Sequence, residues 1–133
     1  MKRTESISLS LSEQAELLRQ RKISAVELTG DYIKRIEILN PQLNAYITVT
    51  AESALESARK AQIEIDSGDY KGSLHGIPIA VKDQICTKGI RTTNSSTLLG
   101  DYVPNFDATI ITKLKKAGAI SVSYTHLTLP TKA

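Results

Sequence analysis

The chain has 133 residues, 41% hydrophobic and 23% charged, so it is long enough for one core and has a soluble globular composition. Its 17 basic and 14 acidic residues are interspersed and leave a net charge of +3, so no direct nucleic-acid binding is expected. No apolar stretch near the N-terminus is long enough for a signal peptide or a membrane span, and the single cysteine excludes an internal disulfide. We therefore expect a cytoplasmic protein that does not contact a membrane.

Two capped helices are predicted at the start of the chain. The capping-box pairs are Ser10 with Glu13 and Ser24 with Glu27. The first helix is expected over about residues 11–21. The second should end at Asn40 and Pro41, because proline disfavours helical backbone at the residue before it.

A strand and a third helix are expected next. Residues 45–49 are β-prone, and Thr50 is predicted to cap a helix that ends at Ser67 and Gly68. That helix should bury a face of small residues, namely Ala54, Ala58, Ala61 and Ile65.

The second half of the chain alternates strand, helix and strand. Residues 77–81 form an apolar run typical of a strand buried on both sides in a parallel sheet. A loop over about residues 87–104 leads to a helix that we expect Asp107 to cap and Ile110, Leu114 and Ala117 to anchor, before Gly118 ends it. Ala119 and Ile120 should begin the next strand. This order predicts an incomplete α/β fold, because a covered sheet needs more than the two or three strands seen here.

Lys82 is the leading candidate for a catalytic residue. It ends the apolar strand, and open α/β sheets place reactive groups beyond the carboxyl ends of their strands. If the strand alternates, Lys82 shares a face with Pro78 and Ala80, and burial there would favour the neutral amine, which can accept a proton. On residue type alone, a solvated lysine that pairs with Asp83 is the commoner arrangement.

Other chemistry has weaker support. His75 and Cys86 flank the same strand, but no third group is evident to complete a thiol hydrolase, so a loop histidine and an inert cysteine are favoured. The hydroxyl-rich segment Thr92–Ser96 is best explained by turn and capping roles. The sequence contains no phosphate-binding loop, dinucleotide fingerprint or paired-cysteine metal motif, so no cofactor or metal is predicted.

Residues 74–83, with the sequence LHGIPIAVKD, closely resemble the lysine-bearing segment of the amidase signature family. The stretches 87–93 and 107–119 resemble the same family in order and spacing, as do the leading helices, so the resemblance spans about residues 8–121. It implies the amidase signature fold, in which N-terminal helices precede the first strands of a mixed sheet covered by helices.

The resemblance also implies amide bond cleavage by a Ser/cis-Ser/Lys triad. In this family a lysine acts through a bridging serine to deprotonate the nucleophilic serine, and Lys82 matches that lysine. Both serines and the oxyanion loop belong to a Gly/Ser-rich segment downstream of the matched residues, so Ser95 and Ser96 do not replace them. The chain alone is therefore expected to be inactive, and the exposed apolar faces of the incomplete domain should make it poorly soluble.

The family pattern stops after Ile120, where a G-K-x-N motif would normally follow. Residues 122–131, which include His126, resemble a translated sequencing-adapter sequence. We predict that residues 1–121 are the N-terminal part of an amidase domain and that residues 122–133 are a non-native tail. A genuine edge strand is the alternative for this tail, because Leu127 and Leu129 alternate with threonines.

Three functions follow from these residues. The first is an amide hydrolase acting on a small-molecule amide that the segment does not define. The second is the glutamine-hydrolysing A subunit of a tRNA-dependent glutamyl or aspartyl amidotransferase, which works with partner subunits. Residues Cys86–Gly89 of this chain resemble that branch of the family. The third is a non-catalytic interaction module in which Lys82 only ends a strand.

Overall fold

Two capped helices open the part of the chain that the computed structural model describes, residues 6–125. α2 spans Leu11–Arg19 and α3 spans Ala25–Leu43. Both begin with the predicted capping box, in which the serine hydroxyl accepts from a backbone N–H and the glutamate accepts from the serine N–H. The two predicted helix starts are confirmed.

The prediction that α3 ends at Asn40 and Pro41 is wrong, because the helix continues through the proline to Leu43. A proline this close to the end of a helix removes only one backbone hydrogen bond. The following residues compensate: Asn44 adopts a left-handed φ of 48° and its N–H donates to the Asn40 carbonyl at 2.7 Å. The Asn40 side chain also accepts from the Tyr46 N–H at 2.9 Å.

Thr50 joins the first strand, β1 (Tyr46–Val49), to α4 (Ala51–Asp66), but it does not cap the helix with its side chain as predicted. Its hydroxyl instead donates to the carbonyls of Ser121 and Val122, each at 3.1 Å, because the strand that holds them lies alongside. The predicted small-residue face of α4 is confirmed. Its buried members are Ala54, Ala58, Ala61 and Ile65.

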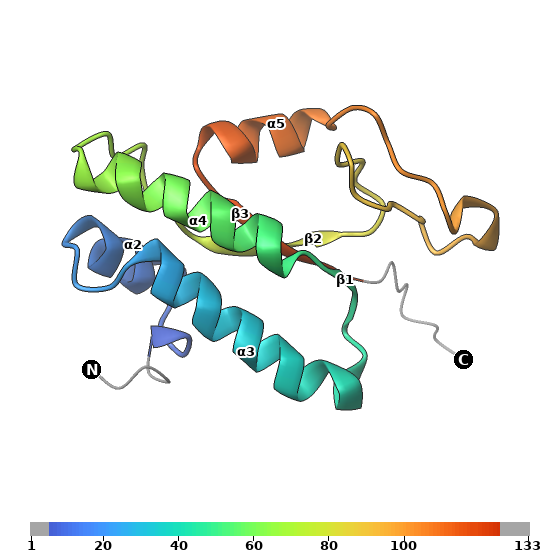
Figure 1. Ribbon diagram of the computed structural model, residues 1–133, viewed down its shortest axis with the longest axis horizontal. Helices are drawn as coiled ribbons and strands as arrows, with labels where there is room; N and C mark the ends of the chain where they lie inside the picture. The colour runs from blue at the N-terminus through green and yellow to red at the C-terminus, as the bar shows by residue number, and fades with distance from the viewer. Residues whose placement is uncertain (1–5, 126–133) are drawn as a thin grey trace.

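The strands form a three-stranded mixed sheet, which agrees with the predicted fold class. β3 (Ile120–Thr125) is central; it pairs parallel with β2 (Pro78–Lys82) and antiparallel with β1. Figure 1 shows α4 crossing in front of these strands, with α5 above and α3 below. The end of β2 leads into the long loop that precedes α5.

The prediction that β2 is buried on both sides is wrong for the described residues. Val81 is buried at 3% exposure, whereas Ala80 is exposed and both Pro78 and Lys82 are half-buried. β2 is one of the two edge strands of the described sheet, so the described residues supply neither a further strand beside it nor a complete second layer over it.

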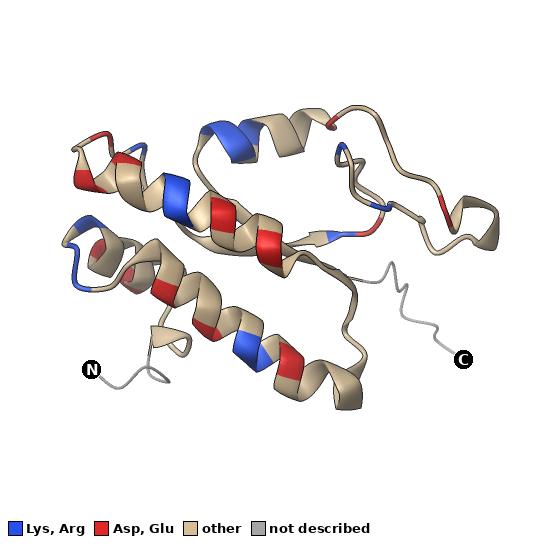
Figure 2. Ribbon diagram, viewed as in Figure 1, with Lys and Arg blue, Asp and Glu red and all other residues tan. Residues whose placement is uncertain are grey.

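α5 (Thr109–Lys116) ends before Gly118 as predicted, but its start and its buried face differ from the prediction. Asp107 does not cap the helix, because its carboxylate accepts from the Lys88 N–H and from the Lys115 ammonium, each at 2.7 Å. Ile111 is the buried anchor, while Ile110 is 52% exposed. The last turn carries basic residues, coloured blue in Figure 2, and their positive charges suit the negative end of the helix dipole.

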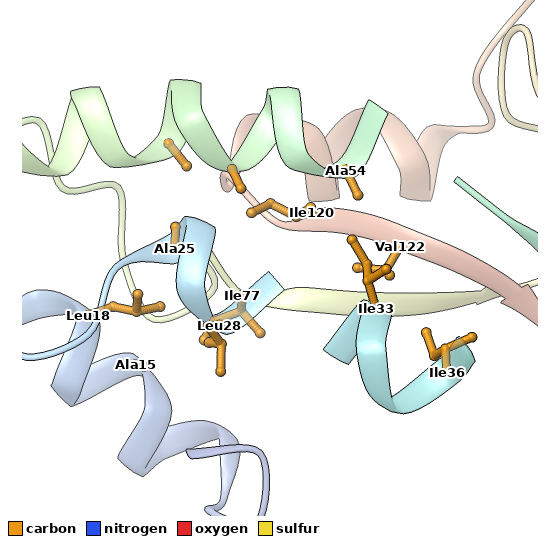
Figure 3. Close-up of a cluster of buried hydrophobic side chains, with 12 residues drawn as sticks. Ala15, Leu18, Ala25, Leu28, Ile33, Ile36, Ala54, Ile77, Ile120 and Val122 are labelled. Carbon is orange, nitrogen blue, oxygen red and sulfur yellow. The ribbon is translucent and has the colours of Figure 1, made fainter. Parts of the chain in front are cut away.

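The main core lies where α2, α3 and α4 meet the strands. Figure 3 shows Leu18 and Leu28 close to Ile77 of the segment before β2, and Ala54 close to Ile120 and Val122 of β3. A second cluster joins Ile111 of α5 to Val81 and Tyr124. The two clusters hold β2 and β3 between α3, α4 and α5, and so determine where the end of β2 lies.

Four residues of the predicted tail, 122–125, belong to β3, while residues 126–133, including His126, lie outside the described residues. The boundary at residue 121 and the origin of the tail stay predictions. None of the helices within residues 6–125 is long and apolar enough to cross a bilayer.

Candidate active site

Lys82 is the last residue of β2, which confirms its predicted place at the carboxyl end of a strand. Its side chain is half-buried. The alternative in which Lys82 pairs with Asp83 is not observed, because the Asp83 carboxylate binds Thr93 instead. Within residues 6–125, no hydrogen bond or ion pair holds the Lys82 ammonium. The amine is therefore presented at the strand end without being neutralised by a neighbouring carboxylate.

Asp83 is a buried carboxylate that the sequence did not single out as a site residue. It is 1% exposed and accepts two hydrogen bonds from Thr93: one from the backbone N–H at 3.1 Å and one from the hydroxyl. This contact assigns a role to one member of the hydroxyl-rich segment, and it differs from the predicted turn and capping roles because its partner is a distant carboxylate. No local spacing rule relates Thr93 to a residue ten positions earlier, just after a strand, so the pair could not be found from the pattern alone.

A largely apolar hollow of about 530 Å³ lies beyond the end of β2. Its wall includes the segment Gln84–Cys86, Asn94 and three partly exposed large side chains, Tyr102, Phe106 and Ile110. Cys86 therefore lies at the Lys82 end of β2, in an apolar wall. This setting matches the predicted role of Cys86 as a small apolar side chain.

His75 lies before β2, at the other end of the strand from Cys86, and it is fully buried. Its Nδ1 accepts from the Lys71 N–H at 3.1 Å, so in the neutral ring the proton is on Nε2, which donates to Glu64 at 2.8 Å. Tyr70 stacks on the ring with centroids 6.0 Å apart. His75 thus joins the 70–76 loop to α4, and the structure does not bring it together with Cys86 as a catalytic pair.

Glu64 has a lowered pKa, chiefly because it accepts a hydrogen bond from the Lys71 ammonium and also because of His75. A carboxyl with a lowered folded-state pKa contributes stability above its unfolded pKa and loses that contribution as the pH falls through the folded value. We expect Glu64→Gln to reduce the free energy of unfolding by roughly 1 kcal/mol at pH 7, with the difference shrinking below about pH 4.5. Urea unfolding of the full-length wild-type protein and of the variant, at pH 7 and at pH 3, measures this difference in the free energy of unfolding.

Glu56 provides the matched control, because it lies exposed on the same helix and forms no ion pair with any described residue. Glu56→Gln should change stability by less than about 0.5 kcal/mol at either pH. A Glu64→Gln difference that stays constant between pH 7 and pH 3 would contradict the assigned role of the Glu64 charge.

Comparison with known proteins identifies the family. A sequence model of the amidase family matches residues 27–129, which is more than half of the chain. The chain belongs to the amidase family. The similar curated proteins include the A subunit of glutamyl-tRNA(Gln) amidotransferase from Heliobacterium modesticaldum, which is 43% identical over 115 residues, or 86% of this chain and 24% of that protein.

Solved structures agree with this assignment to the amidase family. Peptide amidase from Stenotrophomonas maltophilia superposes with a TM-score of 0.82 and 29% identity over 87% of this chain and 24% of that one. An amidase family protein from Bacillus anthracis gives a TM-score of 0.84 and 31% identity over 93% of this chain and 25% of that one. These amidases confirm the predicted fold class, and the chain spans about a quarter of their length.

Of the expected triad, only the predicted lysine lies in the part of the chain that the structure describes. Lys82 stands where the family resemblance places the lysine, while the two serines are not among the residues that the resemblance matches. No group of three histidine, cysteine or acidic side chains within residues 6–125 is arranged to hold a metal ion.

Proposed function

We propose that the full-length protein carrying this segment cleaves amide C–N bonds through an acyl-enzyme, with Lys82 as the base. The observation that carries the proposal is the position of Lys82 at the end of β2, in a segment that resembles the lysine motif of the amidase family and lies within the residues that the family model matches. Its amine is held in no ion pair within residues 6–125, so it is available to hydroxyl groups from the remainder of the protein. The matched segment is only 24% of the Heliobacterium modesticaldum relative, which leaves ample chain to supply them.

The proposed reaction proceeds in two stages. A serine hydroxyl adds to the amide carbonyl carbon while its proton passes through a bridging serine to the neutral Lys82 amine. Backbone N–H groups stabilise the oxyanion, and the C–N bond breaks as the leaving nitrogen takes up the proton. Water then adds to the acyl carbon while its proton passes by the same path to the Lys82 amine, and the C–O bond to serine breaks as the serine oxygen takes up that proton, which releases the carboxylic acid.

A second candidate is glutamine hydrolysis for a tRNA-dependent amidotransferase. The specific support is the identity of 43% with the A subunit of glutamyl-tRNA(Gln) amidotransferase from Heliobacterium modesticaldum. In this case the leaving group is ammonia from the glutamine side chain, and the protein works with partner subunits. The chemistry at Lys82 is the same for both candidates, so they differ in substrate and assembly.

The experiment is an amide hydrolysis assay on the full-length protein and on the 133-residue chain, with a simple aryl amide and with glutamine. We expect the full-length protein to release amine or ammonia and to form a covalent adduct with a serine-directed fluorophosphonate, detected by mass spectrometry. The 133-residue chain should do neither, because it contributes only the base.

Hydrolysis by the 133-residue chain at a rate comparable to that of the full-length protein would contradict the proposal. Hydrolysis of glutamine in preference to the aryl amide, together with co-purifying subunits, would favour the amidotransferase. A full-length protein that forms no adduct and cleaves no amide would support the non-catalytic interaction module.

A further inference from the structure

The buried carboxylate next to Lys82 is unusual because it has no basic partner. Asp83 is 1% exposed, and within residues 6–125 no lysine, arginine or histidine forms an ion pair with it. Burying a carboxylate is costly unless hydrogen bonds stabilise its charge. Here both oxygens are satisfied by one residue, Thr93, through its N–H and its hydroxyl. The Asp83–Thr93 pair therefore holds the loop around Thr93 against the end of β2.

The main chain around Lys82 is held from three directions. The Asp83 N–H donates to the Thr125 carbonyl at 2.8 Å, which ties the strand end to β3. The Lys82 carbonyl accepts from the Ile85 N–H at 3.0 Å, and the Asp83 carbonyl accepts from the Asn94 N–H at 2.8 Å. These bonds determine the direction in which the Lys82 side chain leaves the sheet, and one of them depends on the loop that Thr93 belongs to.

That loop contains a strained turn. Asn94 and Ser95 are consecutive non-glycine residues in the left-handed region, with φ of 49° and 55°. Residues in this conformation cost about 1 to 3 kcal/mol each, persist only when their surroundings hold them, and often occur at active sites. The Thr93 hydroxyl holds both sides of the turn, since it donates to Asp83 and accepts from the Ser95 N–H at 3.3 Å.

We propose that Asp83 is a positioning residue of the amidase site, which acts through Thr93 to hold the 93–95 turn against the end of β2 and so aims the Lys82 amine. This inference rests on the proposed function, because a positioning role requires a reaction at Lys82. Loss of the Asp83–Thr93 contact would free the turn and with it the bond from Asn94 to the Asp83 carbonyl. The Lys82 side chain would then adopt orientations in which its amine does not reach the bridging serine hydroxyl.

The test uses two substitutions at Thr93 in the full-length protein. Thr93→Val has nearly the same shape but lacks the hydroxyl, whereas Thr93→Ser keeps it. We expect Thr93→Val to lower kcat for amide hydrolysis on the order of 10-fold to 100-fold, with KM changed by less than about threefold. The pH midpoint of kcat should also move, because the Lys82 amine would no longer face its proposed hydroxyl partner. Thr93→Ser should keep at least about half of wild-type kcat and the wild-type pH profile.

Thr87→Val is the matched control, because Thr87 is also a buried threonine of this loop and its hydroxyl donates to the nearby Ile85 carbonyl. It should leave kcat and the pH midpoint unchanged. Circular dichroism and urea unfolding establish the folded fraction of each variant. If Thr93→Val lowers kcat only in proportion to its folded fraction, or leaves the pH midpoint unmoved, the positioning role is overturned.

The Lys82 and Thr93 variants distinguish a failure of the proposed function from a failure of the positioning role. If Lys82→Ala abolishes turnover while Thr93→Val matches wild type, the proposed function stands and the positioning role is overturned. If Lys82→Ala retains wild-type turnover, the proposed function itself is overturned, and the positioning role with it.

Discussion

Lys82→Ala in the full-length protein is expected to lower kcat/KM for amide hydrolysis on the order of 1,000-fold, while the folded structure is retained. The large effect follows from the role of a general base, without which the serine hydroxyl is a poor nucleophile. The small effect on folding follows from the setting of Lys82, which is half-buried at the end of β2 and whose side chain forms no hydrogen bond or ion pair within residues 6–125. Steady-state kinetics and urea unfolding measure the two effects separately.

Two further variants sharpen this experiment. Lys82→Arg keeps the positive charge but supplies no neutral amine near neutral pH, so it should be nearly as inactive as Lys82→Ala. Lys88→Ala removes an exposed lysine six positions along the chain and should leave kcat/KM within about twofold of wild type. Equal losses in the Lys82 and Lys88 variants would point to a general effect of charge. Full activity of Lys82→Arg would show that positive charge, and not proton transfer, is what the reaction needs.

Gly118→Ala is expected to cause the largest loss of stability, roughly 2 to 4 kcal/mol. Gly118 follows the end of α5 with φ of +80°, where an alanine is strained, and a Cβ there would lie 2.3 Å from Cδ2 of His75. The His75 ring cannot move away easily, because it is fully buried and bonded on both sides to Glu64 and Lys71. Urea unfolding of the full-length protein measures the loss.

Gly68→Ala separates backbone strain from overlap with the imidazole. Gly68 also lies just beyond a helix, α4, with φ of +90°, but a Cβ there meets nothing within 4 Å. It should lose only about 1 to 2 kcal/mol. In the background of His75→Ala, the additional cost of Gly118→Ala should fall to that same value, because the overlapping ring is gone. Equal losses at Gly68 and Gly118 in the wild-type background would contradict the clash.

Much of the local structure could be predicted from the sequence. Both capping boxes, the buried alanine face of α4, the positions of β2 and β3, and the placement of Lys82 at a strand end are confirmed. These features depend on interactions within a few residues, such as a serine with a glutamate three positions later, or on a repeat of apolar side chains along one face. The sequence also indicated the amidase family, because the lysine motif at residues 74–83 and the matching stretches around it occur in the family's order and spacing.

Only the tertiary structure decided which partners the polar side chains take. Thr50 and Asp107 were predicted to cap helices, yet Thr50 bonds to β3 and Asp107 bonds to Lys88 and Lys115. The Asp83–Thr93 contact and the packing of His75 against Gly118 likewise join segments that are distant in the sequence. A hydroxyl or carboxylate can satisfy its hydrogen bonds with any donor or acceptor brought within about 3 Å, and a short sequence pattern does not encode which distant segment folding brings there.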